Sequence, residues 1–298
     1  MTNSKLFGLL ALIFSLLAIP AHSYSPHPFT LSSFVISQPT ADETVQTYYS
    51  RGAVNFDRGD YNQAIIDFTQ ALDIDPNFTN AYLYRGIAYR KQGGAEQAIA
   101  DFTKALELDP GYAVVYNERG LAYNMQGKYD LAIADFTKTL ELDPNYPIAY
   151  NNRGLSYRYL RRYEDAIADY TKAIELKPDY TIVYLNRGLA YRYFKRYEDA
   201  LADYTKAIEL EPDSSLAYSQ RGIIYYRQGE YEKAIADYTK SIEIDPMYSI
   251  AYYNRGQANK ELNRIGEAIT DLERFISLSS DDKLIEMAKK VIKELLEQ

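Results

Sequence analysis

Arginine and aspartate recur in this chain at a spacing that suits ion pairing. An Arg-Gly dipeptide recurs at seven positions spaced 34 residues apart, and an Asp follows each of these seven Arg residues by 16 positions. Two explanations fit: a ladder of charges that binds a ligand, or an Arg-Asp link between helices of a repeat or its neighbour, which is the explanation we favour. The seven pairs are Arg51 with Asp67, Arg85 with Asp101, Arg119 with Asp135, Arg153 with Asp169, Arg187 with Asp203, Arg221 with Asp237 and Arg255 with Asp271.

Residue types suited to catalysis or metal binding are scarce. The 298 residues include no Cys and only two His, His22 and His27, both ahead of the repeats. Disulfides, Cys nucleophiles and Cys metal sites are therefore excluded, and the repeats have no His general base. No phosphate-binding loop or G-x-S-x-G motif occurs, and the prominent acidic residues recur in every repeat, whereas an active site would be unique. We predict a protein that is not an enzyme, with no catalytic residue, cofactor or metal site.

The charge of the chain bears on its partners. Its formal net charge is −8, so no basic surface is expected that would attract nucleic acid or an anionic membrane. We therefore predict no nucleic-acid partner.

Each 34-residue unit predicts two helices. Positions 2 to 14 carry apolar or aromatic residues at helical spacing, and position 15 is Gly in four copies, which is typical of a helix C-terminus. A second helix follows and ends at a Pro in six copies, because Pro lacks the N–H that a continuing helix needs. The units cover residues 45–78, 79–112, 113–146, 147–180, 181–214, 215–248 and 249–282.

A glycine lies within the first helix of every unit, at position 8. Each costs about 1 kcal/mol relative to Ala. We predict that close approach of the two helices offsets this cost, with the Gly facing the Ala at position 20. The seven alanines are Ala64, Ala98, Ala132, Ala166, Ala200, Ala234 and Ala268.

The repeat resembles the tetratricopeptide repeat over residues 45–282. The shared features are an aromatic residue at position 4, Gly at 8, Tyr at 11, Ala at 20, Phe or Tyr at 24, Ala at 27 and Pro at 32. The resemblance implies an all-α fold, an α-solenoid forming a right-handed superhelix of helix-turn-helix repeats. Residues 283–298 alternate apolar and charged side chains at helical spacing, so we expect a C-terminal capping helix there.

In tetratricopeptide proteins the first helix of each unit lines a concave groove, with positions 2, 5, 6, 9, 12 and 13 facing the ligand. In this chain those positions gather amide, Arg and Tyr side chains, which can pair with the backbone and carboxylates of an extended peptide. The resemblance implies a non-enzymatic scaffold that binds a protein or peptide. The implied partner-binding residues are Arg90, Asn124, Asn152, Arg158, Tyr159, Asn186, Arg192, Tyr193, Gln220, Tyr226 and Arg227.

Two other functions remain open. The groove tyrosines, Tyr159 and Tyr193 among them, could stack on sugars in an envelope carbohydrate-binding module. Alternatively, the tyrosines pack on neighbouring repeats and the protein is a spacer without a ligand. The family's clamp for a C-terminal carboxylate needs Asn at position 9, where this chain mostly has Leu or Ile, so chaperone-tail recognition of that type is not expected.

The first 23 residues have the plan of a secretory signal. Lys5 precedes an apolar run from Leu6 to Ile19, and small residues follow at Ala21 and Ser23. As a helix this run would be about 21 Å long, against a hydrocarbon core of about 30 Å. We expect a signal peptide over residues 1–23, or an uncleaved N-terminal anchor, and a flexible linker over residues 24–44. The protein is then exported to a periplasm, a lumen or the exterior, or is membrane-anchored, where assembly of a membrane or envelope complex would suit it.

Overall fold

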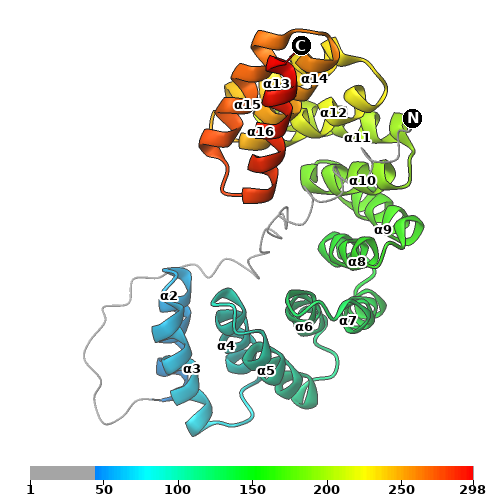
Figure 1. Cartoon of the computed structure of the whole chain (residues 1–298). Coiled ribbons are helices and arrows are strands. Elements are labelled where there is room, and N and C mark those ends of the chain that lie inside the picture. Colours follow the sequence, from blue (N-terminus) through cyan, green and yellow to red (C-terminus); the bar gives the residue numbers. More distant parts are fainter. Residues whose placement is uncertain (1–43, 298) are drawn as a thin grey trace. The chain divides into compact units, whose positions relative to one another are not determined.

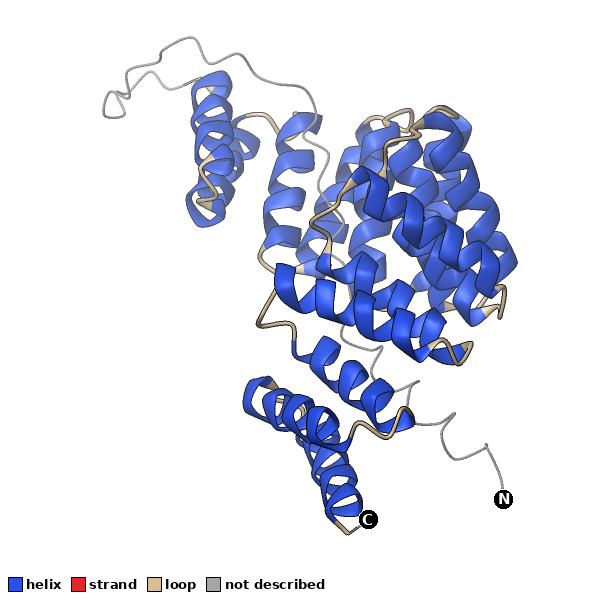
Figure 2. Cartoon of the chain, turned by 90° about the horizontal axis from the view of Figure 1, so that it is seen from above, coloured by secondary structure: helices blue, strands red, loops and turns tan. Residues whose placement is uncertain are grey.

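The computed structural model describes residues 44–297, and within that range all regular structure is helical (Figure 2). The helices follow one another in chain order, each packed on the next (Figure 1), so the predicted all-α solenoid is confirmed. The predicted signal peptide (residues 1–23) and residues 24–43 of the predicted linker lie outside the described residues, whereas Thr44, the last linker residue, caps the N-terminus of α2. The helices are α2 (Val45–Asp57), α3 (Tyr61–Ile74), α4 (Thr79–Lys91), α5 (Ala95–Leu108), α6 (Ala113–Met125), α7 (Tyr129–Leu142), α8 (Pro147–Tyr159), α9 (Tyr163–Leu176), α10 (Thr181–Tyr193), α11 (Tyr197–Leu210), α12 (Ser215–Arg227), α13 (Tyr231–Ile244), α14 (Ser249–Glu261), α15 (Ile265–Leu278) and α16 (Asp282–Leu296).

Two layers of helices result from this order. The first helices of the repeats also contact one another directly: α2 with α4, and so on through α12 with α14. We call the face built by α2, α4, α6, α8, α10, α12 and α14 the first-helix row. The second helices lie between them along the chain, and α16 packs on α15 as the predicted cap. The first-helix row positions every predicted groove residue.

The turn between the helices of a repeat has a left-handed residue at position 15. Gly59, Gly93, Gly127 and Gly229 have φ between 70° and 85° there, which Gly adopts without steric cost. The other three repeats keep the same conformation with a side chain: Arg161 has φ 61°, Lys195 has φ 63° and Asn263 has φ 58°. Stacking of the helices therefore imposes this turn even where the residue disfavours it.

The Gly at position 8 was predicted to face the Ala at position 20, but in repeats 1 to 6 the atoms nearest to it belong to the aromatic residue at position 24. A Cβ added to this Gly in repeats 1 to 6 would come within 2.6 to 2.8 Å of a ring atom of the Phe or Tyr at position 24. In repeat 7 the nearest atoms to a Cβ on Gly256 are Cγ of Leu272, at 3.1 Å, and the carbonyl oxygen of Ala268 at position 20, at 3.2 Å. The glycine therefore leaves room for the aromatic ring of the second helix, and the Ala side chains are buried beside it.

The Arg-Asp pairs predicted from the repeat are all confirmed. The N–O distances are 2.7 to 2.9 Å, and in repeats 2 to 7 the guanidinium donates two parallel hydrogen bonds to the carboxylate. The Nη1 atom of each of these six arginines also donates to a Thr hydroxyl of the preceding repeat, at 3.0 to 3.3 Å. Each guanidinium thus joins both helices of its own repeat and the second helix of the preceding one.

Candidate functional site

Buried amides connect successive helices of the first-helix row. Asn152 on α8 donates from Nδ2 to Oδ1 of Asn117 on α6, at 3.1 Å, and Asn186 on α10 donates in the same way to Asn151 on α8, at 3.0 Å. All four side chains are buried. Asn152 and Asn186, both predicted to face a ligand, therefore satisfy part of their hydrogen-bonding capacity between repeats. Asn117 and Asn151 were not among the predicted residues, although both occupy position 5 of their repeats, one of the positions expected to face a ligand.

Two predicted arginines reach the next helix of the row. Arg90 on α4 donates from Nη2 and Nε to Oε2 of Glu118 on α6, at 2.6 and 3.1 Å. Arg192 on α10 donates from Nη1 to Oε1 of Gln220 on α12, at 3.1 Å. Burial lowers the pKa of Arg192, and the neighbouring charge of Arg227 acts in the same direction. Arg90 is thus neutralised by a carboxylate, whereas the bond from Arg192 ends on an uncharged amide.

Two further predicted residues make polar contacts between repeats. Asn124 accepts a hydrogen bond from Ser156 Oγ at 2.9 Å, and Tyr226 donates from its hydroxyl to Glu261 Oε1 at 3.4 Å. Burial, followed by the charge of Glu261, raises the pKa of Tyr226. These contacts give both residues a part in joining adjacent first helices.

The predicted tyrosines at the ends of α8 and α10 are stacked. The Tyr159 ring lies parallel to that of Tyr129, with centroids 4.9 Å apart, and Tyr193 lies parallel to Tyr163 at 5.6 Å. In each case the partner ring begins the second helix of the preceding repeat. One face of each predicted ring is therefore covered, although 40% of the Tyr159 surface remains exposed.

Arg158 and Arg227, like Asn124 at its Nδ2, each have a nitrogen that makes no hydrogen bond. Their Nε atoms are shielded from solvent and have no hydrogen-bond partner. The Arg158 guanidinium lies 4.9 Å from the Tyr159 ring centroid, and it is close to the buried hydroxyl of Tyr170. Burial raises the pKa of Tyr170 to about 12, although the positive charge of Arg158 opposes this shift. Tyrosine rings therefore border the Arg158 guanidinium.

The structure thus places all eleven predicted residues on the first-helix row, from α4 to α12. Their binding of a partner stays a prediction, because most of them also hold the repeats together. Among residues 44–297, the Nε atoms of Arg158 and Arg227 and the Nδ2 atom of Asn124 have no hydrogen-bond partner, and Tyr159 is partly exposed.

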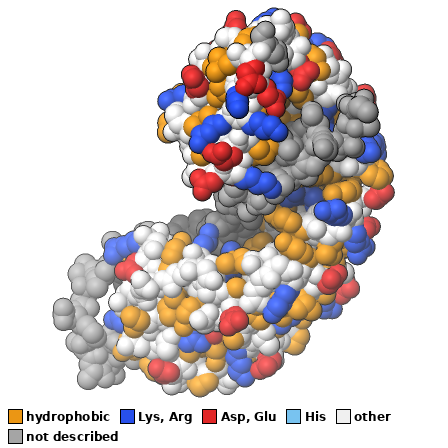
Figure 3. All heavy atoms as spheres, viewed as in Figure 1, with side chains coloured by type: hydrophobic (Ala, Val, Ile, Leu, Met, Phe, Trp, Pro, Cys, Tyr) orange, Lys and Arg blue, Asp and Glu red, His pale blue; other side chains and the backbone are white. Residues whose placement is uncertain are grey.

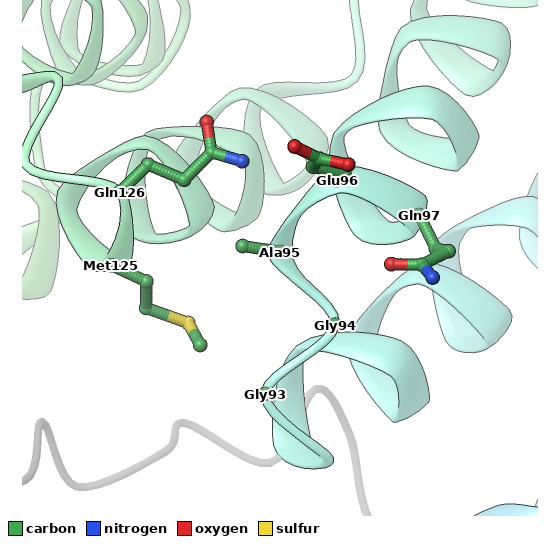
Figure 4. Close-up of a pocket in the computed structure, with 7 residues that line it drawn as sticks. All are labelled: Gly93, Gly94, Ala95, Glu96, Gln97, Met125 and Gln126. Carbon is green, nitrogen blue, oxygen red and sulfur yellow. The ribbon is translucent and has the colours of Figure 1, made fainter.

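A separate depression lies at the turn of repeat 2. Gly93 to Gln97 face Met125 and Gln126 at the end of α6 across an open space of about 390 Å³ (Figure 4). The side chains that line this space are short or flexible, and the only charged one among them is that of Glu96. It offers no constellation of groups for catalysis.

The outer surface has mixed charge. On the face shown in Figure 3, acidic and basic side chains are interspersed among apolar ones. Within residues 44–297, no group of His, Asp and Glu is arranged to hold a metal ion. Over the same range, each helix is too short or too polar to cross a bilayer.

Comparison with known proteins agrees with this architecture. Family models described as "TPR repeat" match residues 52–93, 88–127 and 222–263, and models described as "Tetratricopeptide repeat" match residues 113–146, 147–180, 182–214, 203–236 and 250–282. No curated protein matches the chain.

Solved structures give the same assignment. A tetratricopeptide repeat protein from Parabacteroides merdae is 20% identical, with a TM-score of 0.66 over 85% of this chain and 98% of that chain, which shows the fold alone. YrrB, described as a TPR protein with an unusual peptide-binding site, is 25% identical, with a TM-score of 0.52 over 63% of this chain and 97% of that one. MamA is 30% identical, with a TM-score of 0.51 over 54% of this chain and 94% of that one. With tetratricopeptide models matching nearly all of its repeats, the chain belongs to the tetratricopeptide repeat family.

Proposed function

We propose that this protein is a non-enzymatic scaffold that binds a peptide segment of a partner protein along the first-helix row of repeats 2 to 6. The observation that carries the proposal is the contrast between constant and variable positions. The Gly at position 8 and the Arg-Asp pair occur in every repeat, and an aromatic residue occupies position 24 in six of them; we call these residues the frame. The side chains at positions 6, 12 and 13 of the first-helix row differ among the repeats. A surface that varies on a constant frame is where a solenoid acquires a specific partner.

The amide and tyrosine side chains of the row support a peptide ligand. Asn and Gln offer both donors and acceptors to a peptide backbone, and each buried amide described above retains groups beyond the one it uses. YrrB is described as having an unusual peptide-binding site, and 97% of that protein aligns with 63% of this chain. That likeness supports the class of ligand and does not identify the partner.

The distribution of acidic groups supports a role other than catalysis. Burial raises the pKa of Asp101, Asp169 and Asp203, a property often found in active sites. Each of the three, however, accepts two hydrogen bonds from the Arg of its own repeat. The shift therefore belongs to the repeated frame, whereas a catalytic pair would occur once.

The carbohydrate-binding alternative has less support. Sugar stacking needs a free, flat aromatic face. The parallel neighbours Tyr129 and Tyr163 cover one face of Tyr159 and of Tyr193, and an Arg side chain lies close to each ring. Such rings are better suited to support the arginines than to carry a sugar.

The place of action is part of the same proposal. We infer export, or anchoring by an uncleaved N-terminal segment, from the signal-like residues 1–23. A scaffold that is exported or anchored in this way would act in assembling a membrane or envelope complex. Sequencing the mature N-terminus by mass spectrometry tests export, since cleavage near Ser23 supports it and an intact leader supports the anchor.

Site-specific photo-crosslinking in the native host tests the binding surface. A photoreactive residue replaces Tyr159 on the first-helix row, and a control replaces Leu131, which is 49% exposed on the second helix of repeat 3. We expect a protein crosslink from position 159 that is absent from position 131 and is lost when Arg158, Arg192 and Tyr193 are changed to Ala. Crosslinks only from position 131, or retention by the triple variant, would show that another surface binds the partner.

A further inference from the structure

Tyrosine is the first residue of the second helix, at position 17, in five of the seven repeats. In repeats 3 and 4 this ring stacks on another tyrosine, at position 13 of the next repeat. The centroids of Tyr129 and Tyr159 are 4.9 Å apart and those of Tyr163 and Tyr193 are 5.6 Å apart, with nearly parallel rings. An aromatic ring of the chain itself therefore fills the space beside the turn in these two repeats.

Repeat 2 lacks this ring. Its position 17 is Ala95, and position 13 of the next repeat is Met125. Position 16, which carries Asp, Glu, Lys or Arg in the other six repeats, is Gly94. Repeat 2 is thus without two side chains at the place where repeats 3 and 4 stack their tyrosines.

The depression at the turn of repeat 2 lies at this place. Its lining consists of residues 93–97 of repeat 2 and of Met125 and Gln126 of repeat 3 (Figure 4); we call it the turn pocket. Ala95 and Met125, which stand where the stacked tyrosines stand in later repeats, both line it. Its volume of about 390 Å³ is near the lower end of the range for ligand sites, about 300 to 1,000 Å³. The turn pocket therefore suits a single ring.

The surfaces of the turn pocket suit an aromatic ligand. The Met125 side chain is 49% exposed, and a thioether makes favourable contacts with aromatic rings. Gly93 has open space beside it, since a Cβ added there would meet no atom within 4 Å. An incoming ring therefore meets a thioether, the methyl group of Ala95 and bare backbone.

Gln126 adds a polar group to the turn pocket. Its Oε1 atom is shielded from solvent and has no hydrogen-bond partner. A phenol hydroxyl can donate to this oxygen, or accept from Nε2 if the amide turns. Because a shielded polar atom without a partner is costly, a ligand that brings a hydroxyl to Gln126 is favoured over one that brings only a ring.

We propose that the turn pocket binds a tyrosine side chain of the partner protein, which fills the space of the ring that repeat 2 lacks. This inference rests on the proposed function and specifies one contact of its ligand. The chain's own stacked tyrosines show which side chain fills the equivalent space in repeats 3 and 4. The turn pocket also adjoins the first-helix row, because Met125 is the last residue of α6. A segment bound along the row can therefore extend a side chain into it.

A titration of the full-length protein with N-acetyltyrosinamide, followed by NMR, tests this proposal. Methionine labelled with 13C in its methyl group supplies the signals, and Met125→Leu identifies that of Met125. We expect a saturable upfield shift of the Met125 methyl signal, with half-saturation on the order of millimolar because a single residue offers few contacts. The Met247 methyl group, in a side chain that is 68% exposed after α13, should show no saturable shift.

Related ligands test the choice of tyrosine. N-acetylphenylalaninamide, which lacks the hydroxyl, should bind about two- to tenfold more weakly. N-acetylleucinamide, which lacks the ring, should give no saturable shift. Gln126→Ala should bring the tyrosine and phenylalanine ligands to within about twofold of each other. Equal binding of the tyrosine ligand and either of the other two to the parent protein would overturn the proposal.

Matched variants exchange the ring and the pocket. Ala95→Tyr supplies the missing ring, so it should abolish the Met125 shift and raise the urea midpoint of the protein. Tyr129→Ala opens the equivalent space beside Tyr159, so N-acetyltyrosinamide should raise the urea midpoint of this variant more than that of the parent protein. A gain of stability together with a loss of binding does not arise from misfolding. Binding that persists in Ala95→Tyr, or an equal saturable shift of Met247, would overturn the proposal.

Crosslinking separates this proposal from the proposed function. A photoreactive residue in place of Glu96, which lines the turn pocket, should capture a partner segment at a tyrosine. If it captures this chain itself, or a segment without tyrosine, the proposal fails. If position 159 captures a partner and position 96 captures none, the proposal also fails while the scaffold function stands. If N-acetyltyrosinamide binds but neither position captures a protein, the scaffold function fails instead.

Discussion

Gly86→Ala tests the packing that defines each repeat. An Ala Cβ at this position would lie 2.6 Å from Cε1 and 2.9 Å from Cδ1 of Phe102, whose side chain is fully buried. In an open helix the change would stabilise by about 1 kcal/mol. Overpacking a filled core costs about 1 to 3 kcal/mol and sometimes more. Because the ring has no free space, we expect net destabilisation of up to about 2 kcal/mol.

Gly256→Ala is the matched control. Its nearest neighbours would be Leu272 Cγ at 3.1 Å and the carbonyl oxygen of Ala268 at 3.2 Å, so a shift of a few tenths of an ångström accommodates it. We expect a change between zero and about 1 kcal/mol of stabilisation. Combining Gly86→Ala with Phe102→Leu copies the repeat 7 arrangement and should recover part of the loss, as a favourable coupling in a double-mutant cycle.

Urea denaturation followed by circular dichroism measures the global effect, since the chain has no Trp for fluorescence. Hydrogen exchange resolved by helix is needed as well, because repeat arrays unfold in parts. Exchange should accelerate first in α4 and α5. The packing argument is refuted if Gly86→Ala is as stable as the parent protein. It is also refuted if Phe102→Leu changes the free energy of unfolding by the same amount in the parent protein and in Gly86→Ala.

Three further predictions concern single sites of the frame. Lys195→Gly should stabilise by about 1 kcal/mol, measured by urea denaturation, because it removes a side chain from a left-handed residue with φ 63°. Asp203→Ala should destabilise by about 3 kcal/mol, because the partly buried Arg187 would lose its bidentate partner. Stability should fall as the pH rises from about 10 to 12, because the unfolded chain ionises tyrosine at a lower pH than the buried Tyr170, whose pKa is raised to about 12; Tyr170→Phe should reduce that fall.

Each of these has an internal control. Asn263→Gly should stabilise less than Lys195→Gly, because Asn tolerates the left-handed region better than Lys, and no difference from the parent in either variant would contradict the strain argument. Glu209→Ala removes the exposed pair with Lys206 and should leave the urea midpoint unchanged, so an effect equal to that of Asp203→Ala would contradict the burial argument. If the stability of Tyr170→Phe falls between about pH 10 and 12 as much as that of the parent protein, ionisation of other tyrosines causes the fall.

The repeat period predicted the frame because it reports what every copy shares. Asp at a fixed distance from each Arg located the ion pairs without any knowledge of helix geometry. The same comparison gave the left-handed turn only in part: four glycines at position 15 marked it, while Arg161 and Lys195 show that stacking imposes it on other residues.

Contacts between variable positions were not predictable in this way. Arg90 reaches Glu118 across 28 residues, and Asn186 reaches Asn151 across 35. Periodicity places such residues on one face, but only the distance between helices decides whether two side chains meet or both reach solvent. The glycine contact failed for a related reason: helical spacing put Ala64 and Phe68 on the same side of α3, and the larger ring occupied the space.

The Arg-Thr hydrogen bond between successive repeats limits which insertions and deletions the solenoid can accept. The bond runs from Arg187 to Thr171, and its counterparts recur at every boundary from repeat 1 onward. Removing or duplicating one of repeats 1 to 6 brings an equivalent Arg against an equivalent Thr. Duplication of such a unit therefore lengthens this protein and keeps the same Arg-Thr hydrogen bond at each boundary between repeats. An insertion of any other length between an Arg and the Thr of the preceding repeat would change their spacing.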